Sequence, residues 1–262
     1  MENPDLSAPD DARRFGGLAR LYGDAGRARL AAAHVCVVGI GGVGSWAVEA
    51  LARSGVGRLT LIDLDHVAES NINRQIHASD ATLGQAKVDA MRERIAGYNP
   101  ACQVAVVDDF VTTDNCAELL GAGFDYVIDA IDSVRVKVAM IAFCRGAGVP
   151  VVTCGAAGGQ IDPTQIRVDD LSRTIQDPLL AKVRGQLRKG HGFTRDPKKK
   201  FGVEAVFSTE PLRYPAPEAA CELPATGPAG LNCAGFGSIV TVTACVGMFA
   251  AARAINALAV ER

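Results

Sequence analysis

A glycine-rich turn between a short apolar run and a helix-like segment constrains the fold of this chain more than any other feature. The turn spans 39–44 and follows the β-branched run 35–38. A helix-like segment comes next, and a second strand-like run, 59–62, ends at Asp63. Strand, glycine turn, helix, strand and acid form the first half of a dinucleotide-binding unit. The glycines predicted to let the backbone approach a phosphate are Gly39, Gly41, Gly42 and Gly44.

The residues after this turn indicate which nucleotide it binds. Asp63 follows Gly39 by 24 residues and is placed to accept hydrogen bonds from ribose hydroxyls. An NAD-binding turn needs no added cation, because backbone amides already serve its pyrophosphate. A triphosphate carries more charge, which Arg74 and Lys87 could compensate. The alternative for Arg74 and Lys87 is that both are solvated surface residues, as most single arginines and lysines are.

Strand-like and helix-like segments alternate along the first 160 residues. This order predicts an α/β fold with a doubly wound, mostly parallel, Rossmann-like sheet and helices on both faces. The candidate strands are 34–39, 58–63, 102–108, 125–130 and 150–154, and the candidate helices are 45–54, 85–97, 114–121, 133–146 and 236–258.

The alternation changes after Gly159, where we expect a C-terminal extension of strands, a long loop and an apolar helix. The segments 161–168 and 203–207 are predicted to be strands without a helix packed between them. Residues 209–230 contain five prolines and are typical of a long loop.

Composition indicates a soluble cytoplasmic enzyme of 262 residues without general affinity for polyanions, since its net charge is −2. Its eight cysteines form no CxxC pair, so no zinc site is expected. Cys36, Cys144 and Cys245 are predicted to be small buried residues in a reducing compartment. The uncharged stretch that ends at Ala252 is best explained as a buried helix, with peripheral membrane contact as the alternative.

Several short motifs resemble the adenylating domain of the ubiquitin-activating-enzyme-like superfamily and, more narrowly, the bacterial tRNA threonylcarbamoyladenosine dehydratases. The resemblance extends from about Arg13 to Ala252, which is nearly the whole chain. It implies a flexible tail over 1–12 and a single ATP-binding adenylating domain over 13–262. In that domain 13–160 would be the nucleotide-binding core, and 161–262 an extension for substrate binding and dimerisation. The motifs are the glycine turn, 14–17, 20–23, 63–65, 70–75, Lys87, 99–100, 129–132, 158–164 and 174–179.

The resemblance also implies roles for individual residues. Asp63 would bind the ribose of ATP, and Asp132 would bind Mg²⁺ at the end of the fourth strand. Asp65 and Asp129 are weaker candidates, and a monovalent cation is a further candidate cofactor. The residues implied to contact the phosphates are Asn71, Arg74, Gln75 and Lys87.

Members of the superfamily commonly insert an arginine from a partner subunit into the ATP site. In this chain the arginine would be Arg14 or Arg20, with Arg20 favoured, and its use would require a homodimer. A sulfur-acceptor protein of a cysteine desulfurase is a further candidate partner. Cys221 and Cys233 could relay an acyl group or sulfur, but neither has a basic neighbour that would lower its thiol pKa, so a passive role is favoured.

A basic segment at 182–200 contrasts with the acidic remainder of the chain. It holds eight basic residues and one acid, Asp196, so its net charge is +7. Such a cluster predicts a local polyanion site, with His191 or Phe193 available to stack on a base; the alternative is a solvated helix face followed by a loop. The basic residues are Lys182, Arg184, Arg188, Lys189, Arg195, Lys198, Lys199 and Lys200.

Together, the resemblance implies ATP-dependent dehydration of threonylcarbamoyladenosine in the anticodon loop of tRNA through adenylation of its carboxylate. One alternative is an adenylyltransferase for a small ubiquitin-like sulfur-carrier protein, which usually has paired-cysteine zinc ligands and does not need the basic segment. A second is a non-enzymatic partner in a sulfur relay. An NAD oxidoreductase fits least, because it leaves Asn71, Arg74 and Lys87 without a role.

Overall fold

The computed structural model describes residues 10–214 and 236–260, and these form one seven-stranded sheet. Its strand order is β3-β2-β1-β4-β5-β7-β6, and every neighbouring pair is parallel except β6 and β7. Val37 of β1 is in register with Leu61 of β2 and Ile128 of β4, so apolar residues fill the centre of the sheet. The strands are β1 (His34–Val38), β2 (Arg58–Ile62), β3 (Gln103–Val107), β4 (Tyr126–Asp129), β5 (Val151–Cys154), β6 (Ile166–Asp170) and β7 (Glu204–Ser208).

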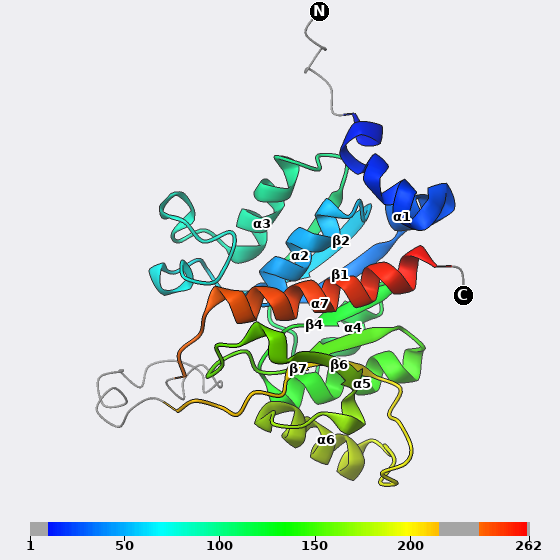
Figure 1. Cartoon of the computed structure of the whole chain (residues 1–262), viewed down its shortest axis with the longest axis vertical. Helices are drawn as coiled ribbons and strands as arrows, with labels where there is room; N and C mark the ends of the chain where they lie inside the picture. The colour runs from blue at the N-terminus through cyan, green and yellow to red at the C-terminus, as the bar shows by residue number, and fades with distance from the viewer. Residues whose placement is uncertain (1–9, 215–235, 261–262) are drawn as a thin grey trace, which may run out of the picture.

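Helices cover both faces of the sheet (Figure 1). One core lies between the sheet and α1, α2, α3 and α7, and the other lies between the sheet and α4, α5 and α6. The helices are α1 (Asp11–Ala32, kinked at Gly23), α2 (Gly44–Arg53), α3 (Lys87–Ala96), α4 (Cys116–Leu120), α5 (Val134–Ala147), α6 (Pro178–Gly190) and α7 (Val240–Ala259).

The predicted α/β architecture is confirmed, and the five strands expected before residue 160 are present within one residue at each end. Two helices were missed. Helix α1 buries only Phe15, Gly26 and Leu30, so its sequence shows no clear apolar stripe. The prediction that no helix separates 161–168 from 203–207 is wrong, because α6 lies between β6 and β7 and packs on α5.

Helix α7 is the apolar helix expected near the C-terminus, although it begins at Val240 and not at residue 236. By length and composition it is the one helix among the described residues that could cross a membrane, but half of its apolar window is buried inside the fold. It crosses one face of the sheet (Figure 1) and buries Val242, Val246 and Ala250 there. Helix α7 is therefore largely a core helix.

The direction of the parallel strands gives the sheet two chemically different edges. The segments that follow β1, β2, β4, β5 and β7 meet at the carboxyl edge, together with the N-terminal end of α7 (orange in Figure 1). At the amino edge lie α1, which leads directly into β1, and residues 191–203, which lead into β7. Ligands of open α/β sheets bind beyond the carboxyl ends of the strands, so the carboxyl edge positions the site.

Candidate functional site

The glycine turn at the end of β1 requires glycine for two distinct reasons. Gly39 has a φ of 87°, a left-handed conformation, and its amide donates to the Ile62 carbonyl oxygen at 2.9 Å. At Gly44 a Cβ atom would lie 1.7 Å from the Gly39 carbonyl oxygen. A Cβ on Gly42 would lie 3.2 Å from Cγ of Arg74. The turn therefore packs against the Arg74 segment with no space for side chains.

Asp63 ties the turn to the end of β2. Its Oδ2 accepts from the Ile40 amide at 2.6 Å, and its Oδ1 accepts from the Asp65 amide at 2.8 Å. Burial raises the pKa of the Asp63 carboxyl, while nearby Lys87 and the two amides act in the opposite direction. Because a carboxylate has about four acceptor positions, positions remain for the ribose hydroxyls expected from the sequence.

The loop after β2 brings Asn71, Arg74 and Gln75 to the glycine turn. Asn71 is buried, and its Oδ1 accepts from the Ala68 amide at 3.1 Å. Nη1 of Arg74 donates to the Ser70 carbonyl oxygen at 2.8 Å, and partial burial lowers the pKa of this guanidinium. Gln75 lies close to Gly41, since a Cβ atom added to Gly41 would be 4.0 Å from Nε2 of Gln75.

Buried polar atoms without hydrogen-bond partners occur in and beside this loop. They are Oγ of Ser45, Oε1 of Gln75 and both ring nitrogens of His77. Burial, followed by the charges of Lys87 and Arg94, lowers the pKa of His77 to about 4, so its imidazole is neutral near pH 7. Buried polar groups are normally satisfied, so Ser45 and Gln75 fit a site completed by a polar ligand such as ATP. Sequence reasoning missed Ser45 and His77, since neither belongs to a spacing pattern.

Lys87 is buried and does not have the solvated position of an ordinary surface lysine. Its side chain is 7% exposed, and its Nζ lies 2.6 Å from Oδ2 of Asp65, a carboxylate that remains 56% exposed. Its charge also stabilises the ionised form of Asp63. A buried ammonium beside a half-exposed carboxylate is compatible with the phosphate contact that the sequence predicts for Lys87.

The end of β4 carries a buried ion pair that sequence reasoning did not identify. Nζ of Lys137 lies 2.9 Å from Oδ1 of Asp129, and both side chains are fully buried. Thr153 of β5 donates to Oδ2 of the same carboxylate at 2.7 Å. Asp129 therefore anchors the strand end, whereas Asp132, three residues on, is exposed. The missed signal is Lys137 itself, a lone charge on the apolar face of α5 beside Val138 and Ile141.

No group of three or more His, Cys, Asp or Glu residues within 10–214 and 236–260 could hold a metal ion. Mg²⁺ in nucleotide sites needs no such group, because one or two carboxylates and the phosphates hold it. An exposed Asp132 at the carboxyl edge therefore fits the role expected for it in binding Mg²⁺ with a nucleotide.

Arg14 and Arg20 lie away from the glycine turn of their own chain. Nη1 of Arg14 donates to the Tyr98 carbonyl oxygen at 2.9 Å, and Arg20 is exposed on α1. The hydroxyl of Tyr22, two residues past Arg20, donates to Oδ1 of Asn256 near the end of α7 at 2.7 Å.

The glycine turn instead contacts the start of α7, because a Cβ on Gly42 would meet Thr243. Asn256 follows Thr243 by 13 residues in α7, which corresponds to a rise of roughly 20 Å along the helix axis. Arg20 cannot bridge this separation within one chain.

The basic segment divides into two parts. Arg184 donates to Oγ1 of Thr174, and Arg188 lies 5.2 Å from the ring of Phe201 and donates to the Thr194 carbonyl oxygen, so both have partners within the fold. Phe193 is partly buried and packs edge-to-face on Phe201 with ring centroids 5.0 Å apart, whereas His191 is exposed, and stacking of either on a base stays a prediction. The exposed basic residues are Lys182, Lys189, Arg195, Lys198, Lys199 and Lys200. Because the last four precede β7, they lie at the amino edge.

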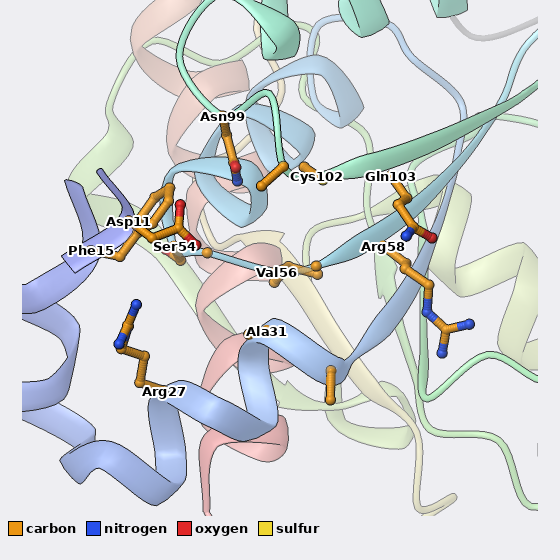
Figure 2. A pocket seen from close by; sticks show the side chains of 14 residues that line it. Asp11, Phe15, Arg27, Ala31, Ser54, Val56, Arg58, Asn99, Cys102 and Gln103 are labelled. Carbon is orange, nitrogen blue, oxygen red and sulfur yellow. The ribbon is translucent and has the colours of Figure 1, made fainter. Parts of the chain in front are cut away.

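A pocket of about 360 Å³ also opens at the amino edge (Figure 2). Asp11, Phe15 and Arg27 of α1 lie on one side of it, and Asn99 and Cys102 lie between α3 and β3. The pocket contains none of the residues predicted to bind the nucleotide. It is separate from the site at the carboxyl edge.

Five of the six cysteines in the described segments are not poised for thiolate chemistry, because burial raises their pKa. Burial raises the pKa of Cys102 and Cys116 to about 11 and that of Cys144 and Cys154 to about 12. Burial also raises the pKa of Cys36, which like Cys144 is fully buried as expected, whereas Cys245 is only partly buried. Cys221 and Cys233 lie outside the described residues.

Comparisons with known proteins show the family of the chain. Residues 15–261 match the ThiF family. The chain is 56% identical over 248 residues to tRNA threonylcarbamoyladenosine dehydratase of Escherichia coli (93% of this chain, 92% of that protein). It is 53% identical over 247 residues to the enzyme of that name from Haemophilus influenzae (94% and 93%). The structure matches a crystal structure of the E. coli enzyme in complex with ATP, with a TM-score of 0.85, 53% identity and 94% coverage of both chains. The chain therefore belongs to the ThiF family and, within it, to the tRNA threonylcarbamoyladenosine dehydratases.

Proposed function

We propose that this chain catalyses the ATP-dependent dehydration of threonylcarbamoyladenosine in the anticodon loop of tRNA. The observation that carries the proposal is the convergence of a glycine turn, the Asp63 carboxylate and two partly or fully buried cations, Arg74 and Lys87, at one edge of the sheet. In a chain this similar to a named dehydratase, these residues form an ATP site for adenylation. Such an enzyme acts in the cytoplasm, where tRNA is modified.

The reaction activates a carboxylate, which is a poor electrophile because its leaving group would be oxide. A carboxylate oxygen of the threonyl group attacks the α-phosphorus of ATP, and pyrophosphate leaves. The ureido oxygen then attacks the acyl carbon, expels AMP and closes a ring, while the ureido nitrogen loses its proton. The removed water corresponds to the oxygen carried away by AMP, the ureido proton, and the proton that the threonyl carboxyl group had already lost on ionising. The second step is intramolecular, so its nucleophile acts at high effective concentration.

The residues of the site stabilise the charge that develops on the phosphates. Asp63 holds the ribose end, while Lys87 and Arg74 face the phosphates. Asp132 would hold Mg²⁺ beside the triphosphate, and the ion would supply further neutralisation of the phosphate charge. The ring closure needs no catalytic nucleophile, which agrees with the raised thiol pKa values of the buried cysteines.

Arg20 enters this proposal only as a residue from a partner subunit, since its neighbour Tyr22 contacts α7 at Asn256, roughly 20 Å along that helix from Thr243 beside the glycine turn. The active unit is then a homodimer. The basic residues at the amino edge would contact the tRNA backbone away from the anticodon loop. No contact among the described residues favours a sulfur-acceptor protein as an additional partner.

The proposal is tested by incubating the purified protein with ATP, Mg²⁺ and tRNA that carries threonylcarbamoyladenosine. Mass spectrometry of the digested nucleosides should show loss of one water from the modified adenosine. Lys87→Ala and Arg74→Ala should each slow this reaction by about 10²- to 10³-fold, the usual cost of losing one preorganised electrostatic contact. Arg167→Met, an exposed change on β6, is the matched control and should act like the wild type.

Two outcomes would count against the proposal. Unchanged turnover in both Lys87→Ala and Arg74→Ala would place the triphosphate elsewhere. Intact modified adenosine, together with ATP-dependent adenylation of a sulfur-carrier protein, would favour the carrier adenylyltransferase.

A further inference from the structure

A second pocket, of about 430 Å³, lies at the carboxyl edge on the side of β5 and β7. Asp177 in its wall accepts from the Ala156 amide, two residues past the end of β5, and Pro211 follows the end of β7 by three residues. The strand order puts β5 and β7 two and three strand spacings from β1, roughly 10–15 Å. The pocket therefore neighbours the glycine turn without overlapping it.

One wall of this pocket is fixed by Asp177. Its Oδ1 accepts from the Leu180 amide at 2.8 Å and its Oδ2 from the Ala156 amide at 2.9 Å, so it caps α6 and binds the loop after β5. Gly155 is required beside it, because a Cβ there would lie 1.9 Å from Oδ2. Arg184, about two turns beyond Asp177 along α6, donates to Oγ1 of Thr174. This hydrogen bond holds the Arg184 guanidinium in the pocket lining without a ligand.

The lining of the pocket also includes an aromatic ring that is exposed but anchored. Tyr214 is 74% exposed, and its ring centroid lies 5.2 Å from that of Phe236. The preceding residue, Arg213, donates its amide to the Gly159 carbonyl oxygen at 2.7 Å. Glu210 accepts from the Ile161 and Asp162 amides, both at 2.9 Å. These contacts fix the backbone that presents the Tyr214 ring to the pocket.

Gln176 contributes a polar group at the rim of the pocket. Among the described residues it is the one non-glycine residue with a positive φ, 55°, and its side chain is exposed. Such a conformation persists where the surrounding structure fixes it, and it clusters at ligand sites. An amide side chain offers both a donor and an acceptor, which suits the edge of a nucleobase.

We propose that this pocket receives a nucleobase of the tRNA substrate, turned out of its stack in the anticodon loop, against the Tyr214 ring and the Arg184 guanidinium. Single-stranded RNA is recognised by stacking of splayed bases on aromatic rings and guanidinium planes, with hydrogen bonds to the base edges. Pro211 and Leu212 make part of the lining apolar, which suits a base. The negative charge of the Asp177 carboxylate in the same lining disfavours a phosphate as the occupant. The proposal rests on the proposed tRNA dehydration and assigns the subsite that positions the loop.

The test uses the full-length protein and anticodon stem-loop RNAs that carry 2-aminopurine at one loop position at a time. The fluorescence of 2-aminopurine reports unstacking of that base and its new contacts. At one position, binding to the wild type and to Tyr214→Phe should change the signal, and this change should be lost in Tyr214→Ala. With modified tRNA as substrate, Tyr214→Ala and Arg184→Met should each raise KM for tRNA about 5- to 150-fold, the range for one base–aromatic contact. KM for ATP should not change.

Arg167→Met on β6 is the matched control for the loss of an arginine and should keep the wild-type KM. Folding is checked by circular dichroism, and Tyr214→Phe separates the ring from the hydroxyl. If the wild type dehydrates tRNA but Tyr214→Ala and Arg184→Met keep its KM, or if no loop position depends on Tyr214, the pocket proposal is wrong. A wild type that dehydrates no tRNA, yet shows the Tyr214-dependent signal, would overturn the proposed function and leave RNA binding by this pocket supported.

Discussion

Lys137 is the residue whose burial is least expected for its chemistry. Its ammonium and the Asp129 carboxylate are both fully buried, and Thr153 completes the network. A buried ion pair contributes little net stability, but removing one partner leaves an uncompensated charge in the core. The network therefore fixes the end of β4, and with it the start of the loop that carries Asp132.

Lys137→Met should lower the free energy of unfolding by about 3–5 kcal/mol, because it leaves Asp129 buried without its partner. Adding Asp129→Asn should recover much of this loss, since the amide is neutral and still accepts from Thr153. Urea denaturation of the wild type, both single variants and the double variant gives the coupling energy. Additive effects of the two substitutions would show that the pair is not coupled.

At the scale of elements, a buried carboxylate joins α2 to α3. Glu49 of α2 is 3% exposed, and its oxygens accept from Nε of Arg53 at 2.7 Å and from Nε of Arg94 of α3 at 2.9 Å. The hydroxyl of Tyr98 donates to the same carboxylate at 3.0 Å. Burial opposes ionisation of Glu49, but the bonds from Arg94 and Arg53 outweigh it and hold its pKa below 4.5.

Because the pKa of Glu49 is lower in the folded state, its contribution to stability is present above pH 4.5 and is lost as the pH falls through the folded-state pKa. Glu49→Gln should cost about 2 kcal/mol at pH 7, less than for a fully buried pair because both arginines are partly exposed. The difference between wild type and variant should shrink below pH 4.5. Denaturation at pH 7 and in steps below pH 4.5 checks this, and a difference independent of pH would contradict it.

The sequence predicted elements well where local patterns and tertiary packing agree. Valine runs and the glycine turn predicted β1 and α2 to within a residue. Helix α1 was missed because its apolar residues are few, and it is held by long-range contacts such as the bond from Tyr22 to Asn256. The sequence of α6 does contain a helix pattern: an Asp177-Pro178 start is followed by apolar residues at helical spacing, Leu179, Leu180, Val183 and Leu187. The helix was missed because the segment was interpreted from its basic residues.

In the candidate site, too, the sequence could place residues that follow a local pattern but not those that depend on long-range contacts. Residues next to strand ends, such as Asp63 and Asp132, could be placed from topology alone, because parallel strands end at one edge. The partners of Lys137 could not, since β4, α5 and β5 meet only in the folded chain. Likewise, the sequence predicts a strand at 203–207 but not its direction in the sheet, so it could not show that Lys198 to Lys200 lie at the edge opposite the glycine turn.

At the scale of the whole molecule, the separation of Arg20 from its own glycine turn leads to a prediction about subunits. If Arg20 acts in a partner's site, Arg20→Ala and Lys87→Ala each disable every site in a homodimer of identical subunits. A mixed dimer of the two variants contains one site with both residues intact. Mixing the two purified variants under conditions that exchange subunits should therefore restore activity to about a quarter of that of the wild type, by random pairing.

The control for subunit exchange is Arg20→Ala mixed with the double variant Arg20→Ala/Lys87→Ala, which lacks Arg20 in every subunit and should regain nothing. Full activity of Arg20→Ala alone would exclude a role for Arg20. Absence of recovery in the mixture, with exchange shown by a labelled subunit, would contradict its action in the partner's site.

The central claim is that this site activates a carboxylate by adenylation, and oxygen-18 in the threonyl carboxylate of the tRNA substrate tests it most directly. Attack on the α-phosphorus forms a bond between the labelled oxygen and phosphorus, and ring closure leaves that oxygen on AMP. We predict AMP that carries one labelled oxygen for each nucleoside dehydrated, and unlabelled pyrophosphate. Labelled inorganic phosphate, or label released only as water, would contradict the account.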